Sequence, residues 1–383
     1  MAASLYLAAG KVTDAVTHGF LPAAARLGVP VVLLTDRPAA HAAVFDGPVV
    51  RCDVTDHRAI VAAAEDGPEP LGIFTNSDFL QSPAALAADY FGLPGKDWRA
   101  ALRAKDKLLA RRHLAALDPV FAAPADRVPA GAPYPLVLKP RAGVASEDVV
   151  LVRDAAELAA RRAEIAARRD DPLIVEEYLP GELHTLETLG DGTELRVLGS
   201  FRTALSPPPH FVEERLEWAA PPPESAAVLT LLGALGVGFG ACHTEFVVHA
   251  GRARIIEVNY RLIGDHCDFL LAELLGVPLF EQILGVHLGR PLPPPVPAPG
   301  LAAVAEPVLA ERPGTLAAAP GPWEGDDGGV RVRYLPQRAV GDAVAVTRTN
   351  RDYLGTIRAI GPDATAVDAA VARFRAAHAW TVA

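Results

Sequence analysis

Three polar side chains stand at alternate positions in the segment IIEVNYRLIGDH, which begins with an apolar run of the kind that forms a buried strand. They are Glu257, Asn259 and Arg261. Because strand side chains alternate between the two faces of a sheet, these three share one face. An unpaired buried charge is costly, so a carboxylate, an amide and a guanidinium on one face indicate a ligand-binding site. A solvated strand end is the alternative, and it explains Glu257 alone better than the whole set.

The preceding segment, ACHTEFVVHAGRAR, predicts the other strand of a hairpin that turns near Ala250 and Gly251. In that hairpin Glu245 lies across from Glu257 or Asn259. Two carboxylates and an amide oxygen are hard donors that suit Mg²⁺, which takes few protein oxygens and completes its shell with water and phosphate. The guanidinium beside them offers a planar fork for phosphoryl oxygens.

Two lysines and a loop can supply further phosphate contacts. Lys139 ends the apolar strand PLVLK, and the following PRAGVASED turns around Gly143, whose neighbouring N–H groups can fold over phosphates. Lys107, in KDKLLAR, is a second candidate cation. The segment IVEEYLPG offers acidic side chains and backbone groups that can bind a purine amino group and ribose hydroxyls.

The first 95 residues alternate short apolar strands with helix-like segments, which predicts a parallel α/β sheet. The first turn, AAGKVTD, has one glycine and therefore lacks the GxGxxG motif of a nicotinamide site. Asn76, Ser77 and Asp78 follow a strand of this sheet, where such folds bind ligands, and are candidate substrate contacts.

The rest of the chain predicts helices and antiparallel hairpins. Residues 95–117 predict one continuous helix, and a terminal helix is expected within residues 366–380. The segment PPPHFVEERLEWAAPPP, residues 207–223, predicts an irregular, mobile lid because prolines bracket it. The run RPLPPPVPAPG, residues 290–300, predicts a semi-rigid linker.

Composition excludes several classes of protein. A net charge of -10 without any block of Lys and Arg argues against a nucleic-acid partner. Three widely spaced cysteines without a CxxC pair indicate a reducing compartment and argue against a disulfide scaffold or a structural zinc site. No apolar run approaches the roughly 20 residues of a membrane span, and the first residues do not read as a signal peptide. We therefore expect a cytoplasmic protein with no membrane partner.

Taken in order, the DK helix start, VLKP with its loop, VEEYLPGE, TEF and EVNYR resemble the ATP-grasp superfamily of carboxylate–amine and carboxylate–thiol ligases, over roughly residues 1–290. The resemblance implies an α/β and α+β fold. Its parts would be a Rossmann-like domain at residues 1–95, a small lid subdomain at 96–180, and a large catalytic subdomain at 181–383 with a C-terminal extension. The last two would grip ATP between them.

The resemblance also implies roles for individual residues. Lys107 and Lys139 would bind phosphates, and Glu182 would face the ribose or the substrate. The adenine hinge would comprise Glu176, Glu177, Tyr178 and Leu179. The ligands of Mg²⁺, or of Mn²⁺, would be Glu245, Glu257 and Asn259. Arg261, with Lys139, would stabilise an acyl phosphate, and Asp265 and His266 would stand at substrate positions.

Two departures from the family pattern concern the loop and the strand end. The loop RAGVASED is poorer in glycine than its counterparts, and EVNYRLIGDH replaces the usual EVNPR. A narrower resemblance, carried by NYRLIGDH alone, is to ligases of siderophore pathways of the vibrioferrin type.

The implied reaction couples a small-molecule carboxylate to an amine through an acyl phosphate, with release of ADP and phosphate. Dimers are common in the family, so a homodimer is one expectation. The alternatives on the same fold are an ATP-dependent kinase, a carboxylate–thiol ligase or a non-catalytic nucleotide-binding module. A nicotinamide oxidoreductase is disfavoured by the missing glycine motif.

Overall fold

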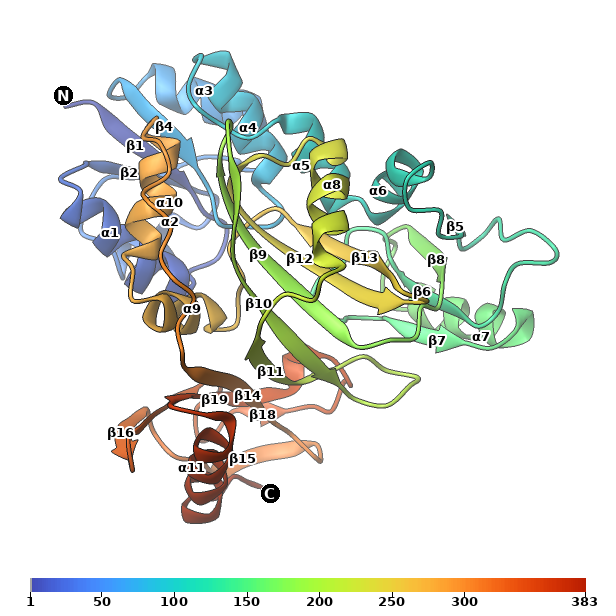
Figure 1. Ribbon diagram of the computed structural model, residues 1–383. Helices are drawn as coiled ribbons and strands as arrows, with labels where there is room; N and C mark the ends of the chain where they lie inside the picture. The colour runs from blue at the N-terminus through green and yellow to red at the C-terminus, as the bar shows by residue number, and fades with distance from the viewer. Residues whose placement is uncertain (1) are drawn as a thin grey trace.

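The computed structural model describes residues 2–383 and arranges them around four sheets (Figure 1). In Figure 1 the N-terminal part lies at the top left, a small sheet lies at the right, and the C-terminal part lies below a long twisted sheet. Among the described residues no single helix combines the length and the apolar composition of a membrane span, and the one helix pair that meets both criteria jointly is bent by 101°.

The N-terminal sheet is parallel, as its alternating sequence predicts. Its strands β1 (Ser4–Ala8), β2 (Val31–Thr35), β3 (Val49–Arg51) and β4 (Pro70–Phe74) lie in the order β3-β2-β1-β4. Strands β1 and β2 are buried throughout because helices cover both faces. The helical elements of this part are η1 (Ala15–Phe20), α1 (Leu21–Arg26), α2 (Pro38–Ala42), α3 (His57–Glu65) and α4 (Gln81–Tyr90).

The segment predicted as one helix over residues 95–117 is two helices, α5 (Trp98–Lys105) and α6 (Lys107–Leu114). The break lies at Asp106, whose extended backbone (φ -101°, ψ 99°) leaves its carboxylate free to accept from the N–H of Leu109 at 3.0 Å. The same carboxylate accepts from Arg141 at 2.7 Å. Lys107 is therefore the first residue of a helix, at a kink tied to the strand that carries Lys139.

A four-stranded antiparallel sheet follows, in the order β5-β8-β6-β7. Its strands are β5 (Ala122–Pro124), β6 (Leu136–Pro140), β7 (Val150–Val152) and β8 (Leu173–Glu177). Helix α7 (Ala155–Ala166) covers it through Leu158 and Ile165. The hairpin predicted around Gly143 is present as β6 and β7.

The largest sheet has nine strands, in the order β13-β12-β9-β10-β11-β14-β19-β17-β16. They are β9 (Leu183–Asp191), β10 (Leu195–Leu205), β11 (Glu213–Ala219), β12 (Phe239–His249), β13 (Arg252–Asn259), β14 (Ala302–Leu309), β16 (Trp323–Asp327), β17 (Val330–Pro336) and β19 (Tyr353–Gly361). The hairpin predicted to turn near Ala250 and Gly251 is confirmed as β12–β13, and β9 and β10 are also antiparallel neighbours in this sheet.

The prediction of an irregular lid at residues 207–223 is wrong, because this segment contains β11. Strand β11 pairs with β10 and with β14, and so joins β9, β10, β12 and β13 to the strands of the C-terminal part in one continuous sheet. Its apolar side chains alternate with polar ones, and Leu216 is buried in the main core. The flanking prolines bound a strand here, in keeping with their tendency to stand at strand ends.

The remaining helices pack on the two large sheets. They are α8 (Ser225–Leu235), α9 (Cys267–Leu275), α10 (Leu279–His287), η2 (Asn350–Asp352) and α11 (Ala364–Ala377). A three-stranded sheet of β15 (Gly314–Ala318), β18 (Ala343–Val344) and β20 (Thr381–Val382) completes the C-terminal part.

The division into residues 1–95, 96–180 and 181–383 remains a proposal. Ala100, Ala104 and Leu114 of α5 and α6 pack in the core of α8 and β13, so we propose that the small unit begins after α6.

Candidate active site

One cavity of about 800 Å³ lies where the carboxyl edge of the N-terminal sheet faces the four-stranded and nine-stranded sheets. It collects the predicted site residues from all three. Those that line it are Asn76, Ser77, Asp78, Lys107, Lys139, Glu176, Glu177, Tyr178, Leu179, Glu182, Glu245, Glu257, Asn259, Arg261 and Asp265. His266 is the predicted residue that lies outside the lining. Positions more than 180 residues apart therefore share one chamber.

The β12–β13 hairpin brings the predicted metal ligands together. Glu245 is opposite Glu257, which is one of the two pairings that the sequence predicts, and His243 is opposite Asn259. The two carboxylates are less than one-fifth exposed and Asn259 is buried. Within residues 2–383 no three His, Cys, Asp or Glu side chains are grouped as a protein-only metal cage would need. Two carboxylates and an amide nevertheless fit Mg²⁺, whose remaining ligands are water and phosphate.

Lys107 joins the metal-ligand face to the loop between β6 and β7. Its ammonium donates to Oε1 of Glu257 at 2.8 Å and to the carbonyl oxygen of Gly143 at 3.0 Å. Burial alone would lower the pKa of Lys107, but the Glu257 carboxylate raises it above its ordinary value. The lysine is therefore charged and lies beside both the proposed metal site and the proposed phosphate loop.

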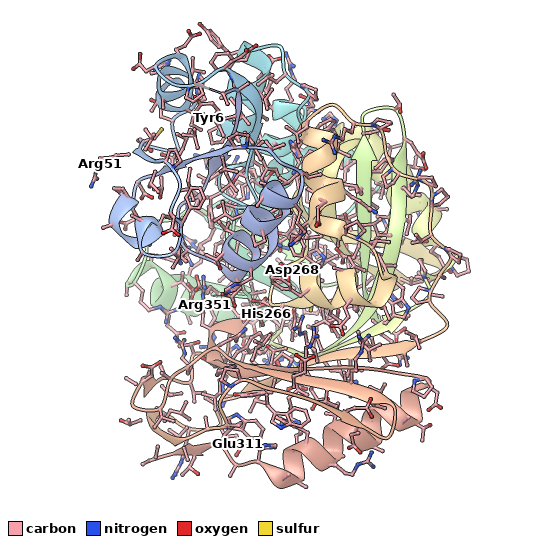
Figure 2. The ribbon with its side chains drawn as sticks, turned by 90° about the vertical axis from the view of Figure 1, so that its left-hand side faces the viewer. Tyr6, Arg51, His266, Asp268, Glu311 and Arg351 are labelled. Atoms are coloured by element: carbon pink, nitrogen blue, oxygen red, sulfur yellow. The ribbon has the colours of Figure 1, made fainter. Side chains whose placement is uncertain are left out.

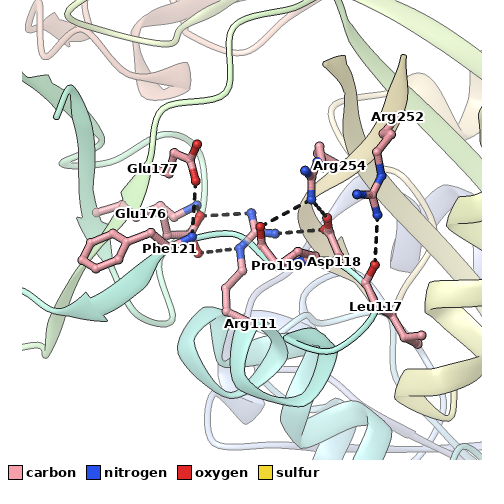
Figure 3. A network of polar contacts seen from close by, with 10 residues as sticks. Arg111, Leu117, Asp118, Pro119, Phe121, Glu176, Glu177, Arg252 and Arg254 are labelled. Carbon is pink, nitrogen blue, oxygen red and sulfur yellow. Dashed lines mark hydrogen bonds and ion pairs between the residues drawn. The ribbon is translucent and has the colours of Figure 1, made fainter. Parts of the chain in front are cut away.

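Lys139 forms an ion pair with Glu176, which also belongs to the network of polar contacts in Figure 3. Its Nζ lies 2.6 Å from Oε2 of Glu176. Burial would raise the pKa of Glu176, yet Arg111 and Lys139 lower it to about 2. Arg111 also lies 3.5 Å from Asp118, which accepts from Arg254 at 2.6 Å. The Glu176 carboxylate thus points to two cations, so its role in this structure is to orient Lys139.

The other residues predicted for the adenine and ribose end follow β8. Glu177 accepts from the N–H of Phe121 at 3.4 Å, and Tyr178 lies with its ring 6.2 Å from that of Phe211. Glu182 is half exposed and lies 3.2 Å from His184. These residues surround an apolar wall that includes Leu179, as a planar base requires.

The carboxyl end of β4 lies close to Arg261, which follows β13. Asn76 accepts from the N–H of Leu262 at 3.2 Å, and Asp78 forms an ion pair with Lys105. Burial alone would raise the pKa of Asp78, but Arg261 and Lys105 have the larger effect and hold it below its ordinary value. Arg261 donates to the carbonyl oxygen of Leu262 at 2.8 Å. The N-terminal sheet therefore positions the loop that carries Arg261.

Of the two predicted substrate contacts in the loop after Arg261, only one lines the cavity. Asp265 and His266 both have left-handed backbone conformations, with φ of 53° and 65°. Asp265 lines the cavity, whereas His266 lies 3.2 Å from Asp14 and accepts through its carbonyl oxygen from Arg358 at 3.1 Å. Figure 2 shows His266 at the level where the N-terminal and C-terminal parts meet. His266 thus ties the loop to both parts.

His243 lies between two carboxylates behind the metal-ligand face. Its Nδ1 is 2.7 Å from Oε1 of Glu187, and its Nε2 is 3.5 Å from Oε1 of Glu245. Burial would lower the pKa of His243, but the carboxylates of Glu187 and Glu245 raise it to about 10. In turn, the imidazolium lowers the pKa of Glu245 against the opposite effect of burial. The pair therefore keeps Glu245 ionised.

The cavity-lining residues that sequence reasoning missed include Glu213, Asn350 and Arg351. Among the described residues Glu213 has no ion-pair partner for its carboxylate. Burial, Glu245 and Asp265 raise the pKa of Glu213 to about 8. The alternation of β11 could have pointed to Glu213 had the segment been recognised as a strand. No local signal pointed to Asn350 or Arg351, which are about ninety residues beyond the motif strand.

Known proteins resemble this chain in sequence and in fold. Residues 104–265 match the family described as the ATP-grasp domain. The chain is 27% identical to the uncharacterized protein y4rH of Sinorhizobium fredii (strain NBRC 101917 / NGR234), over 95% of this chain and 80% of that protein.

Two solved structures share the fold over the full length of both chains. They are the L-amino acid ligase from Bacillus licheniformis (21% identity, TM-score 0.80) and the phosphoribosylglycinamide synthetase from Anaerococcus prevotii (14% identity, TM-score 0.73). A biotin carboxylase from Campylobacter jejuni matches 98% of this chain and 92% of its own, with 17% identity and a TM-score of 0.69. The expected fold class is confirmed.

Proposed function

Because residues 104–265 match the ATP-grasp domain, we propose that the protein is an ATP-dependent ligase that activates a carboxylate as an acyl phosphate and couples it to an amine. One observation carries this proposal. Two lysines, the oxygen donors of the β12–β13 hairpin and Arg261 converge on one chamber with substrate-sized space beyond them. Two proteins that share the fold, an L-amino acid ligase and a phosphoribosylglycinamide synthetase, support a carboxylate–amine ligase.

In the proposed reaction a carboxylate oxygen of the substrate attacks the γ-phosphorus of ATP, and the bond to the bridging oxygen breaks to release ADP. The amine nitrogen then attacks the acyl carbon, the acyl C–O bond breaks, phosphate leaves, and the nitrogen loses a proton. Lys107 and Lys139 would neutralise triphosphate oxygens, and Arg261 would hold the transferring phosphoryl group. Neither step requires a covalent bond to the protein.

Glu245, Glu257 and Asn259 would hold Mg²⁺ or Mn²⁺. When bound, the metal would offset the charge that accumulates on the phosphate oxygens. His243 lies beside Glu245 and Lys107 lies beside Glu257, and these contacts orient the two carboxylates toward the chamber. Asn76, Ser77, Asp78 and Asp265 are proposed to contact the acid or the amine.

The test is ADP release by the purified protein with an array of carboxylates and amines, followed by mass spectrometry of the products. The proposal requires an amide product whose formation depends on ATP, on a divalent metal and on both substrates. A phosphorylated product without coupling would identify a kinase, and a thioester would identify a thiol ligase. A metal-dependent ATP shift in melting temperature without any turnover would identify a nucleotide-binding module.

Three finer assignments belong to the same proposal. The segment NYRLIGDH supports a place in siderophore biosynthesis, which siderophore precursors in the substrate array would test. The sparse cysteines support a cytoplasmic location. A homodimer is proposed by family resemblance, and sedimentation of the purified protein would test it.

A further inference from the structure

The loop between β6 and β7 lines part of the cavity and has a backbone conformation that its own residues do not favour. Gly143, Val144, Ala145 and Ser146 line the chamber. Ala145, Ser146 and Asp148 all have left-handed backbone conformations, with φ of 58°, 54° and 56°. Such conformations are unfavourable for residues other than glycine, so contacts from outside the loop must maintain them.

One set of contacts comes from η2, the helical turn directly before β19. The backbone N–H of Asn350 donates to the carbonyl oxygen of Ala145 at 3.1 Å. The guanidinium of Arg351 donates from Nε to Oε1 of Glu147 at 2.6 Å. The Asn350 side chain also accepts from the N–H of Glu213 at 3.1 Å. This turn therefore bridges the loop to β11 across the side of the cavity.

The η2 turn is itself firmly fixed. The buried carboxylate of Asp352 accepts from the backbone N–H groups of Thr347 and Arg348, at 2.9 and 2.7 Å. The Thr347 hydroxyl donates to the same carboxylate at 2.6 Å, and the backbone of Asp352 accepts from Ala310 at 3.0 Å. A rigid turn can impose a position on a neighbouring loop, whereas a mobile one cannot.

The ion pair between Arg351 and Glu147 can break without unfolding the protein. The side chains of Arg351 and Glu147 are 48% and 36% exposed, and exposed ion pairs contribute little to stability. The loop has further attachments: Ser146 donates to the carbonyl oxygen of Phe211 at 2.9 Å, Lys107 donates to that of Gly143, and Asp148 forms ion pairs with Arg168 and Arg169. Figure 2 shows Arg351 at the junction of the C-terminal part with the rest of the molecule.

We propose that Arg351 is a positioning residue, which together with Asn350 fixes the Gly143–Asp148 loop over the phosphates of bound nucleotide. The C-terminal part then sets how readily the loop closes. This inference rests on the proposed function for the identity of the nucleotide, but the attachment of the loop is independent of it. The scarcity of glycine in the loop is thereby offset by support from a distant segment.

The experiment compares wild type with Arg351→Ala, Arg351→Lys and the exchanged pair R351E/E147R. Arg373→Ala is the matched control, because Arg373 donates through Nε to Asp327 at 2.6 Å in an ion pair of similar exposure within the same part of the chain. Hydrogen exchange of residues 143–149 is measured without added nucleotide. ATP dependence is then measured as KM against kcat.

Faster exchange of the loop in R351A, with R373A unchanged, is the expected result. The KM for ATP should rise by up to about fivefold while kcat is largely retained, since an exposed ion pair supplies no more. R351K and the exchanged pair should restore loop protection in part. Wild-type exchange in R351A, or faster exchange with no recovery in either rescue variant, would overturn the proposal. If the protein forms no ADP, the exchange data still decide between these outcomes, so failure of the proposed function is recognised separately.

Discussion

The Nζ atom of Lys107 lies 2.8 Å from Oε1 of Glu257, so a proposed phosphate ligand and a proposed metal ligand form one ion pair. The pair lies at the kink between α5 and α6 and reaches across to the end of β13. A metal–nucleotide complex would divide it, with the cation turning to phosphate oxygens and the carboxylate turning to the metal. The site can therefore keep both charges compensated before and after nucleotide binds.

This relationship predicts that Lys107→Ala destabilises the fold as well as weakening ATP binding. The sequence alone predicts less than about 1 kcal/mol for loss of a ligand-facing lysine. Removal of this cation instead leaves a largely buried carboxylate beside Glu245, for which we expect about 2 kcal/mol. Urea unfolding of K107A, E257Q and the double variant would measure the coupling. Strictly additive losses would show that the two side chains do not depend on each other.

A larger loss of stability is expected when Arg111 is replaced by methionine. Glu176 and Asp118 then remain buried without the cation that lies between them (Figure 3). Breaking one side of a buried pair typically costs about 3–5 kcal/mol. The matched control is Arg161→Met, which removes an exposed pair with Glu164 and should change the free energy of unfolding by less than about 0.5 kcal/mol. Equal effects of the two substitutions would contradict this interpretation of the network.

The extent to which sequence predicted the site depends on how local each signal is. Glu257, Asn259 and Arg261 were predictable because a period of two within one strand fixes their common face. Glu245 followed from a tight turn. Glu213 was not predictable, because prolines on both sides of β11 obscured a strand whose partners lie in two different parts of the chain. Arg351 depends on a contact with Glu147 across about two hundred residues, which no local pattern encodes.

The ionisation of Glu213 should make the free energy of unfolding depend on pH. An unfolded glutamate loses its proton near pH 4.3, whereas burial and the neighbouring carboxylates raise the pKa of Glu213 in the fold to about 8. Between these values the folded state binds more protons, so this group makes stability fall as pH rises. Glu213→Gln removes the effect, and its advantage over wild type should grow through that window by at most about 1.4 kcal/mol per pH unit. Unfolding across the window checks this, with Glu214→Gln as the exposed neighbour control; parallel curves for E213Q and wild type would rule it out.

Glu257→Gln should alter the metal dependence of the reaction. The amide keeps the size of the side chain and one acceptor oxygen but removes a negative charge from the proposed ligand set. Half-maximal activity should therefore require about tenfold more Mg²⁺, with turnover largely recovered at saturation. A magnesium titration of ADP formation measures this. Glu182→Gln, which changes a cavity-lining carboxylate outside the proposed ligand set, is the control that should leave the magnesium titration unchanged. An identical titration for E257Q and wild type would remove Glu257 from the metal site.

Arg261→Lys distinguishes charge from geometry at the position where the phosphoryl group would transfer. Lysine keeps the positive charge but cannot present two parallel N–H donors, so ATP should still bind while formation of the acyl phosphate slows. Loss of an oriented charge of this kind typically lowers the rate about a hundredfold. Single-turnover formation of ADP measures the step directly, and a thermal shift with ATP measures binding. Arg252→Lys, at the exposed start of β13, the strand that precedes Arg261, is the matched control and should retain the wild-type rate. If R261K also retains that rate, the alternation in EVNYR is only a polar strand end, and Arg261 has no part in phosphoryl transfer.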